Sequence, residues 1–219
     1  DFTAQVKHNF FNDIRGGGHF SGRLTLILVA AGTVAKKIAS DVSFNASIKQ
    51  IGGSDNPAEW DGIISGAMAE GDSVGGIIEC VCNGVPAGLG EPFFNSLESE
   101  IAHLAFSIPG VRGIEFGDGF AAAAMKGSEH NDCFTDIDGH TATNGAGGIN
   151  GGISNGNPIV FRIAVKPTSS ISKVQHTANF ITGEIEEFSV KGRHDACIAL
   201  RCPVIVEAIA AIALAQHIQ

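Results

Sequence analysis

Residues 15–25 combine a glycine run with polar side chains just where a helix is predicted to begin. The segment reads Arg-Gly-Gly-Gly-His-Phe-Ser-Gly-Arg-Leu-Thr. A glycine-rich loop that leads into a helix presents free backbone N–H groups at the positive end of the helix dipole. Ser21 adds a hydroxyl, and Arg23 adds a guanidinium suited to phosphate or carboxylate. The segment predicts an anion site; a loop that merely turns the chain is the alternative.

A second glycine-rich stretch precedes a cluster of hydroxyls. Six glycines lie between Asn144 and Gly156, a density that is costly in chain entropy. We expect such a loop to let the backbone approach a planar or phosphorylated ligand. After the next predicted strand comes Lys166-Pro-Thr-Ser-Ser170, with one cation and three hydroxyls. This predicts a phosphate cradle at a strand end, with an ordinary Ser/Thr turn as the alternative.

The segment 192–197 reads Gly-Arg-His-Asp-Ala-Cys and stands just ahead of a very apolar stretch. Arg193, His194 and Asp195 supply a cation, a titratable imidazole and a carboxylate. A surface charge cluster is the alternative, but the position against an apolar helix favours a lined pocket. We expect the loops described so far to converge on one hollow beside that helix.

Two nucleotide-binding signatures are matched only loosely. The spacing of Gly17 and Gly22 is similar to that of a P-loop, but Arg23-Leu24 stands where Lys-Ser/Thr is required, which argues against an NTPase. Residues 117–122 match the relaxed dinucleotide pattern G-x-G-x-x-A, but no clear acidic partner closes a βαβ unit after them. A tight turn between a strand and a helix is the favoured interpretation of the second segment.

The apolar pattern predicts helices and strands without regular βαβ alternation. The last predicted helix is apolar nearly all round, so it must be buried between other layers. The sequence therefore predicts an α+β fold, with sheets packed on a buried helical layer. Helices are expected over 21–39, from an Asn95/Glu98 capping box through Ala105, and from Pro203 through Ile218. Strands are expected over 42–51, 76–82 and 159–165, and 41–71 is otherwise the least patterned stretch, with a turn near 52–57.

Composition excludes several classes of protein. The 219-residue chain has 23 acidic and 14 basic residues, a net charge of -9, which argues against nucleic-acid binding. The longest apolar stretches, 24–35 and 204–215, are shorter than the roughly 18–20 residues of a membrane span. No targeting segment is recognised. Five cysteines without a C-x-x-C pair predict buried thiols in a reducing cytoplasm and no metal site.

These segments, in this order, resemble the chorismate synthase family over essentially the whole chain. The resemblance implies a β-α-β sandwich, with residues 1–219 as a single N-terminally truncated core, assembled as a cytoplasmic homotetramer. It implies a lyase that converts 5-enolpyruvylshikimate 3-phosphate to chorismate and phosphate by anti-1,4-elimination, using reduced FMN, in the shikimate pathway to the aromatic amino acids. The segments that carry it are 15–23, 71–76, 85–90, 127–132, 144–156, 166–170 and 192–195.

The resemblance also implies roles for single residues. Asp195 matches the family's carboxylate beside flavin N5, where the proton is lost after the flavin has transiently donated an electron. Arg23 matches a group that binds the anionic substrate. The other matches are flavin contacts: His19, Phe20, Ser21, Gly151, Lys166, Pro167, Thr168, Ser169, Ser170 and Arg193.

The chain departs from the family pattern at its start. Family members carry a further N-terminal part with two histidine motifs, and Asp1 stands where the second of these would end. His19 replaces a more usual arginine, and Val74 stands where an echo of the first motif would need histidine. We therefore expect the 219-residue chain alone to be inactive. The alternatives are a non-catalytic, oligomerising core that binds flavin or anions weakly and, less favoured, a nucleotide-dependent oxidoreductase built on residues 117–122.

Overall fold

The computed structural model describes residues 2–13, 15, 17–192 and 194–218. The helices are α1 (Phe2–Lys7), α2 (Thr25–Ile38), α3 (Pro57–Ala69), α4 (Leu97–Ser107), α5 (Gly127–His130) and α6 (Pro203–Ala215). The strands are β1 (Ser43–Ile51), β2 (Gly76–Asn83), β3 (Val111–Phe116), β4 (Ile149–Asn150), β5 (Ile153–Ser154), β6 (Ile159–Val165), β7 (Gln175–Ala178) and β8 (Ile185–Phe188). Short 3-10 helices are η1 (Gly18–Phe20), η2 (Gly22–Leu24), η3 (Phe93–Asn95), η4 (Gly119–Ala124) and η5 (Ile198–Arg201).

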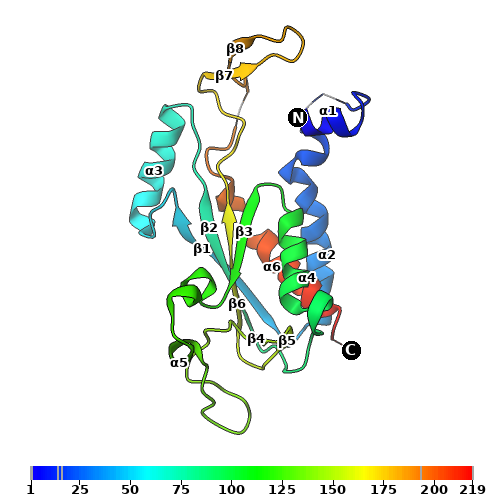
Figure 1. Ribbon diagram of the computed structural model, residues 1–219, viewed down its shortest axis with the longest axis vertical. Coiled ribbons are helices and arrows are strands. Elements are labelled where there is room, and N and C mark those ends of the chain that lie inside the picture. The colour runs from blue at the N-terminus through cyan, green and yellow to red at the C-terminus, as the bar shows by residue number, and fades with distance from the viewer. Residues whose placement is uncertain (1, 14, 16, 193, 219) are drawn as a thin grey trace.

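The main sheet has four antiparallel strands in the order β1-β2-β6-β3 (Figure 1). In β6 the burial alternates, with Ile159, Phe161, Ile163 and Val165 buried. Because side chains alternate across a strand, these four share one face of the sheet and Arg162 lies on the other. Two hairpins complete the strands: β7–β8 lies at one end of the molecule, and β4–β5 lies on the opposite side of the main sheet (Figure 1).

The last helix, α6, is the centre of the helical layer that covers the sheet. Eight of its 13 residues are buried, as expected for a helix apolar on nearly all sides. Helix α2 packs against it so closely that a Cβ on Gly32 would lie 2.4 Å from the Cβ of Ala208. The helices α2, α4 and α6 lie together on one side of the sheet (Figure 1). The predicted α+β fold with a buried C-terminal helix is confirmed.

Element boundaries differ from the sequence-based expectations at three places. Helix α4 is capped by Ser96, whose Oγ accepts the Ser99 N–H at 3.1 Å, and not by Asn95. Helix α6 ends at Ala215, three residues before the predicted end. Helix α3 was not predicted at all, because none of its residues is buried and Gly62 and Gly66 lower its helix propensity. Its start was nevertheless readable, since Asn56 caps Ala58 and Pro57 occupies the first turn.

The cysteines divide into four buried thiols and one exposed thiol. Cys80, Cys82, Cys197 and Cys202 are buried, as predicted, whereas Cys133 is exposed and the prediction is wrong there. The Cys80 and Cys82 sulfurs lie 3.9 Å apart. Burial raises the pKa of Cys202 to about 11. Cys202 therefore remains protonated near neutral pH, and the four buried cysteines act as small core residues.

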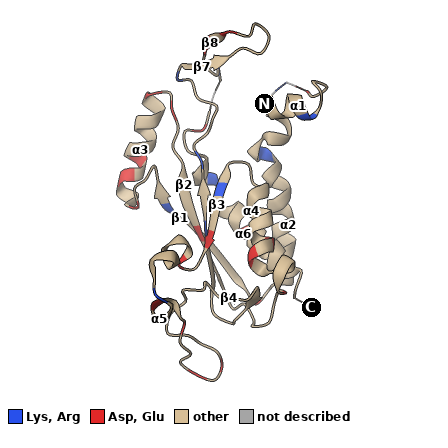
Figure 2. Ribbon diagram, viewed as in Figure 1, with Lys and Arg blue, Asp and Glu red and all other residues tan. Residues whose placement is uncertain are grey.

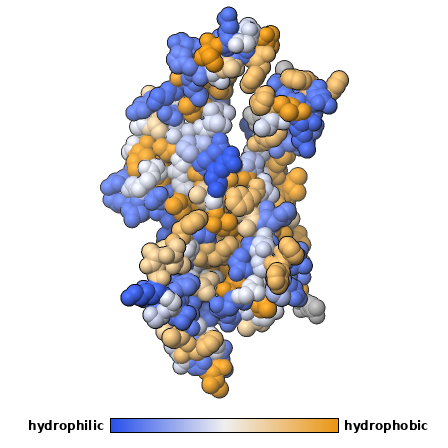
Figure 3. Space-filling model, viewed as in Figure 1, coloured by the Kyte–Doolittle hydropathy of each residue, from blue (hydrophilic) through white to orange (hydrophobic). Residues whose placement is uncertain are grey.

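The surface carries both charges and large apolar side chains. Lysine and arginine are distributed over several elements and do not collect on one of them (Figure 2). Apolar residues are scattered over the face shown in Figure 3. No described helix is long and apolar enough to cross a membrane. Large apolar side chains that are more than half exposed include Phe10, Phe11, Leu26, Ile27, Phe93, Phe94, Phe120, Phe134, Ile137 and Ile181.

Candidate functional site

An open cavity of about 200 Å³ lies among three loops: Gly71–Val74 before β2, Lys166–Lys173 after β6, of which residues 170–172 line it, and His194–Ala196 before η5. We call these the cavity loops. Its polar lining includes Asp72, Ser73, Ser170, His194 and Asp195. The segment ahead of the buried helix thus lines a pocket, as the sequence predicted, and Arg193 lies outside the described residues.

The carboxylate of Asp195 is oriented by a neighbour that the sequence reasoning missed. Its Oδ1 accepts a hydrogen bond from Nη2 of Arg201 at 3.0 Å. Both side chains are well exposed, 48% for Asp195 and 72% for Arg201, so the pair adds at most about 1 kcal/mol to stability. The pair matters for orientation more than for stability, because the hydrogen bond from Arg201 directs the Asp195 carboxylate at the edge of the cavity. The signal available in the sequence was a cation in the turn that leads into α6.

Two polar atoms at the cavity loops are buried without a partner among the described residues. They are the Thr168 hydroxyl and Nε2 of His194. A buried polar group that makes no hydrogen bond costs about 1–3 kcal/mol, so such atoms are normally satisfied. The backbone of Thr168 is held, since its carbonyl accepts the Ser73 hydroxyl at 2.7 Å. His194 lines the cavity, and Thr168 lies two residues before Ser170, which also lines it.

The other residues of the predicted phosphate cradle, Lys166–Ser170, differ in burial and in distance from the cavity. Ser170 lines the cavity, and the Lys166 backbone N–H donates to the Gly110 carbonyl at 2.9 Å. The Lys166 side chain is half-buried, whereas Pro167 and Ser169 are exposed. The segment is therefore a turn at a strand end, and of its five residues Ser170 is the one that lines the cavity.

Residues 19–23 form exposed turns at the start of α2 and do not line the cavity. The Ser21 hydroxyl accepts the Arg23 N–H at 3.3 Å and so caps η2, which leads into α2. The predicted helix start differs from the structure: Ser21 caps the 3-10 turn η2, and the α-helix α2 begins four residues later at Thr25. His19, Phe20 and Arg23 are exposed.

The glycines of 144–156 approach the protein's own backbone. A Cβ on Gly147 would lie 2.4 Å from the Gly117 nitrogen, and one on Gly148 would lie 2.4 Å from the Pro158 carbonyl oxygen. Gly151 is different: it has φ +60° and open space around it. It lies in the turn of the β4–β5 hairpin, on the opposite side of the main sheet from β7–β8 (Figure 1). The expectation of one hollow is therefore wrong for Gly151 within a single chain.

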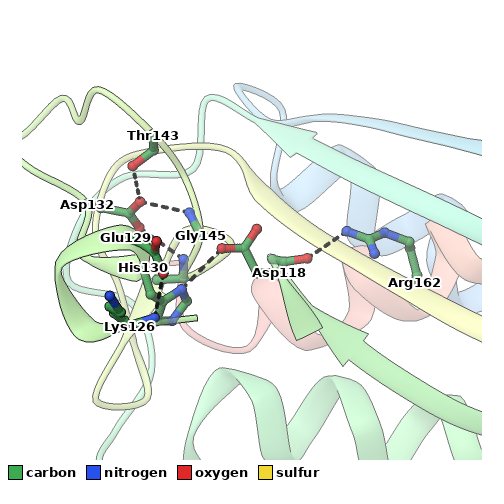
Figure 4. Close-up of polar contacts among 10 residues, drawn as sticks. Asp118, Lys126, Glu129, His130, Asp132, Thr143, Gly145 and Arg162 are labelled. Atoms are coloured by element: carbon green, nitrogen blue, oxygen red, sulfur yellow. Dashed lines mark hydrogen bonds and ion pairs between the residues drawn. The ribbon is translucent and has the colours of Figure 1, made fainter. Parts of the chain in front are cut away.

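The motif 127–132 holds this glycine loop in place (Figure 4). Asp132 accepts hydrogen bonds from the Thr143 hydroxyl at 2.6 Å and from the backbone N–H groups of Gly145 and Ala146 at 2.8 and 2.9 Å. Burial alone would raise the pKa of Asp132, but these hydrogen bonds lower it below its usual value. Nδ1 of His130 lies 3.1 Å from Oδ2 of Asp118. We call residues 117–157 the glycine-loop network.

Arg162 ties this network to the middle of the sheet. Its guanidinium donates to Glu115 at 2.7 Å, to Glu79 at 3.1 Å and to the Gly117 carbonyl at 2.6 Å. Gly117 stands in the turn between β3 and η4, and β3 runs antiparallel to β6. The predicted tight turn is confirmed. The parallel βαβ unit that a dinucleotide fingerprint requires is not formed here, so the oxidoreductase hypothesis loses its support.

Comparison with known proteins gives a consistent result. The family model described as chorismate synthase matches residues 1–219. A chorismate synthase of Chitinophaga pinensis is 62% identical over 217 residues, covering 99% of this chain and 64% of that protein. One of Korarchaeum cryptofilum is 43% identical over 246 residues and covers 100% of this chain and 68% of that protein. A crystal structure of chorismate synthase superposes with a TM-score of 0.76 at 25% identity, covering 98% of this chain and 68% of that one.

The fold, an antiparallel sheet covered by a buried helix, is thus shared with a solved chorismate synthase. The chain belongs to the chorismate synthase family. It spans about two thirds of the length of these relatives. Among the residues that the structure describes, no group of three or more His, Cys, Asp or Glu side chains is arranged to hold a metal ion.

Proposed function

We propose that this chain is part of a chorismate synthase that eliminates phosphate from 5-enolpyruvylshikimate 3-phosphate with the help of reduced FMN. The observation that carries the proposal is the cavity: Ser170, His194 and Asp195, from two of the segments that resemble the family's flavin site, line one hollow. Family membership supplies the reaction class. Because relatives are longer, the activity belongs to the longer chain.

The cavity suits one end of a flavin. Its volume of about 200 Å³ is below the roughly 300–1,000 Å³ of complete ligand pockets, so the remainder of the cofactor would lie outside it. The unpartnered Thr168 hydroxyl and His194 Nε2 offer hydrogen bonds to a polar ring edge or a phosphate. Reduced flavin supplies an electron as phosphate departs.

Asp195 is proposed to assist the proton transfer that completes the elimination. Its position beside Arg201 keeps one carboxylate oxygen occupied and the side chain oriented toward the cavity edge. A group that assists proton transfer acts in the transition state, so its loss lowers kcat more than it raises KM. Arg23, exposed at the start of α2, is proposed to bind the anionic substrate and to contribute chiefly to KM.

The proposal is tested by two measurements on two proteins. The 219-residue chain is titrated with FMN by flavin fluorescence, and it is expected to bind FMN but not to turn over substrate. The full-length enzyme is assayed anaerobically with reduced FMN and substrate, before and after Asp195→Asn. We expect kcat to fall at least about tenfold with little change in KM. An unchanged kcat removes Asp195 from the mechanism, and a chain that binds no FMN removes the flavin site.

We further propose that the protein assembles as a homotetramer in the cytoplasm. The support is the set of exposed apolar side chains along α2, where Leu26, Ile27 and Val34 are 73%, 70% and 59% exposed. Apolar surface of this kind marks interaction sites more often than free surface. Sedimentation equilibrium on the full-length enzyme measures the assembly state directly. A second candidate function for the 219-residue chain, a folded core that assembles without catalysis, predicts oligomers together with no turnover.

A further inference from the structure

The loop between α3 and β2 reads Gly71-Asp-Ser-Val-Gly-Gly76 and touches both of the other cavity loops. Its glycines are sites of close approach. A Cβ on Gly71, which has φ +68°, would lie 2.7 Å from the Ser172 hydroxyl oxygen, and one on Gly75 would lie 2.4 Å from the Val165 carbonyl oxygen. The loop therefore runs in direct backbone contact with the segment that follows β6.

Hydrogen bonds from adjacent residues reach the two cavity loops on either side. The Ser73 hydroxyl donates to the Thr168 carbonyl at 2.7 Å, and the Val74 N–H donates to the Ala196 carbonyl at 2.8 Å. Thr168 and Ala196 belong to segments that are remote from each other in sequence. Because their partners are neighbours in the chain, the two bonds fix the loop of Thr168 relative to the loop of Asp195.

A third contact continues the same arrangement toward β7. Nζ of Lys173 lies 2.9 Å from Oδ2 of Asp72, and the Lys173 N–H donates to the Gly71 carbonyl at 3.0 Å. The side-chain hydrogen bond from Lys173, with a backbone hydrogen bond from Ser73, lowers the pKa of Asp72 below its usual value. Asp72 therefore stays ionised near neutral pH and anchors the far end of the loop that begins at Lys166.

We propose that Gly71–Gly76 is a clamp that holds the Lys166–Lys173 loop and the Asp195 loop in one fixed relation, with Ser73 as its central positioning residue. This inference rests on the proposed function, because the clamp would position the groups proposed there to bind flavin and assist proton transfer. These are the Thr168 hydroxyl, the His194 imidazole and the Asp195 carboxylate. Ser73 does not replace any of them. It acts through the Thr168 backbone, which carries the unpartnered Thr168 hydroxyl into place.

The test compares Ser73→Ala, Ser73→Thr and the control Ser107→Ala in the 219-residue chain. Ser107 also donates its hydroxyl to a backbone carbonyl, that of Leu104 at 2.6 Å, at the C-terminal end of α4, and it does not line the cavity. Amide hydrogen exchange is followed by mass spectrometry in peptides covering 166–173 and 194–197, and FMN affinity is measured by fluorescence. S73A is expected to speed exchange in both peptides and to weaken FMN binding about tenfold, with S73T near wild type and S107A unchanged.

The two readouts separate the clamp from the flavin site. The clamp is overturned if S73A leaves amide exchange in the two peptides unchanged, or if S107A speeds it equally. This holds whatever the FMN affinity of the variants is. If wild type binds no FMN, the proposed flavin site fails while the exchange data still decide the clamp. Should S73A fail to fold, D72N removes the negative charge that Lys173 faces, while its amide oxygen can still accept the Ser73 N–H. Faster exchange confined to residues 171–173 then supports the clamp, and no change there overturns it.

Discussion

The glycine-loop network and the cavity loops differ in how their polar groups are satisfied. In the network, Asp118, His130, Asp132 and Arg162 all engage partners within the protein, and one polar atom, Oδ1 of Asn144, is buried without a partner among the described residues. In the cavity loops, the two groups best suited to bind a ligand, on Thr168 and His194, are the ones left unpartnered. Each region thus leaves a polar atom unsatisfied, but only the cavity loops place a residue that carries such an atom, His194, in the lining of a cavity.

The difference can be tested first at two glycines of the same loop. Gly147 and Gly151 both have positive φ, +68° and +60°, but only Gly147 is crowded by backbone. Gly147→Ala therefore combines left-handed strain with a clash and is expected to cost about 3 kcal/mol or more of unfolding free energy. Gly151→Ala carries the strain alone, about 1–2 kcal/mol. Urea unfolding of the two variants measures the difference, and equal losses would show that crowding does not hold the network.

Asp132→Asn is expected to have the next largest effect. The substitution weakens three hydrogen bonds to a charged acceptor, and we expect a loss of about 1–2 kcal/mol at neutral pH. The pKa of Asp132 is lower in the folded than in the unfolded chain. The unfolded state therefore binds more protons as the pH falls through about 3.8, and the stabilisation is lost there.

This pH dependence gives the second measurement for Asp132. The difference in stability between wild type and Asp132→Asn is expected to be full above about pH 5 and to shrink as the pH drops below 4. Other carboxylates with lowered pKa values, such as Asp72 and Asp136, are present in both proteins and cancel in the difference. Carboxyl groups titrate between about pH 6 and pH 3. If the stability difference between wild type and Asp132→Asn stays constant over this range, the pKa of Asp132 is not lowered by folding.

Thr168→Val is expected to have the smallest effect on stability. The variant removes a buried hydroxyl that has no partner, so unfolding free energy should change by less than about 0.5 kcal/mol or rise. The affinity for FMN should nevertheless fall several-fold, because the variant cannot make the hydrogen bond that we propose between the Thr168 hydroxyl and the flavin. Thermal unfolding with and without FMN reports both quantities. A large loss of stability in the absence of FMN would mean that the hydroxyl already has a structural partner.

Much of the fold was readable from periodicity, because burial on one face leaves a clear pattern. The alternation of β6 and the uniform apolarity of α6 are both determined by what each element packs against. Helix α3 was missed for the converse reason: it buries no residue and is interrupted by glycines. The cap at Asn56 marks where the helix starts, but a single capping residue predicts a helix less strongly than a repeating apolar face does.

The candidate site was predictable in chemistry but not in arrangement. His194 and Asp195 were recognised as groups beside a buried helix, and they do line the cavity. The pairing of Asp195 with Arg201 depends on how the η5 turn folds, and no spacing rule reveals it. The glycines of 144–156 were interpreted as a ligand approach, yet Gly147, Gly148 and Gly152 lie against the protein's own backbone. A glycine in the sequence indicates that a side chain is not tolerated at that position. It does not show whether the protein's own backbone or a ligand occupies the space.

The uneven burial of the cysteines has a practical consequence. Since Cys80, Cys82, Cys197 and Cys202 are shielded, a maleimide dye or spin label should attach to Cys133 alone in the native protein. Cys133 follows Asp132 directly, so the label would sit on the segment that this carboxylate anchors. The wild-type chain thus offers a single built-in attachment point for a spectroscopic reporter, and no cysteine has to be removed to use it.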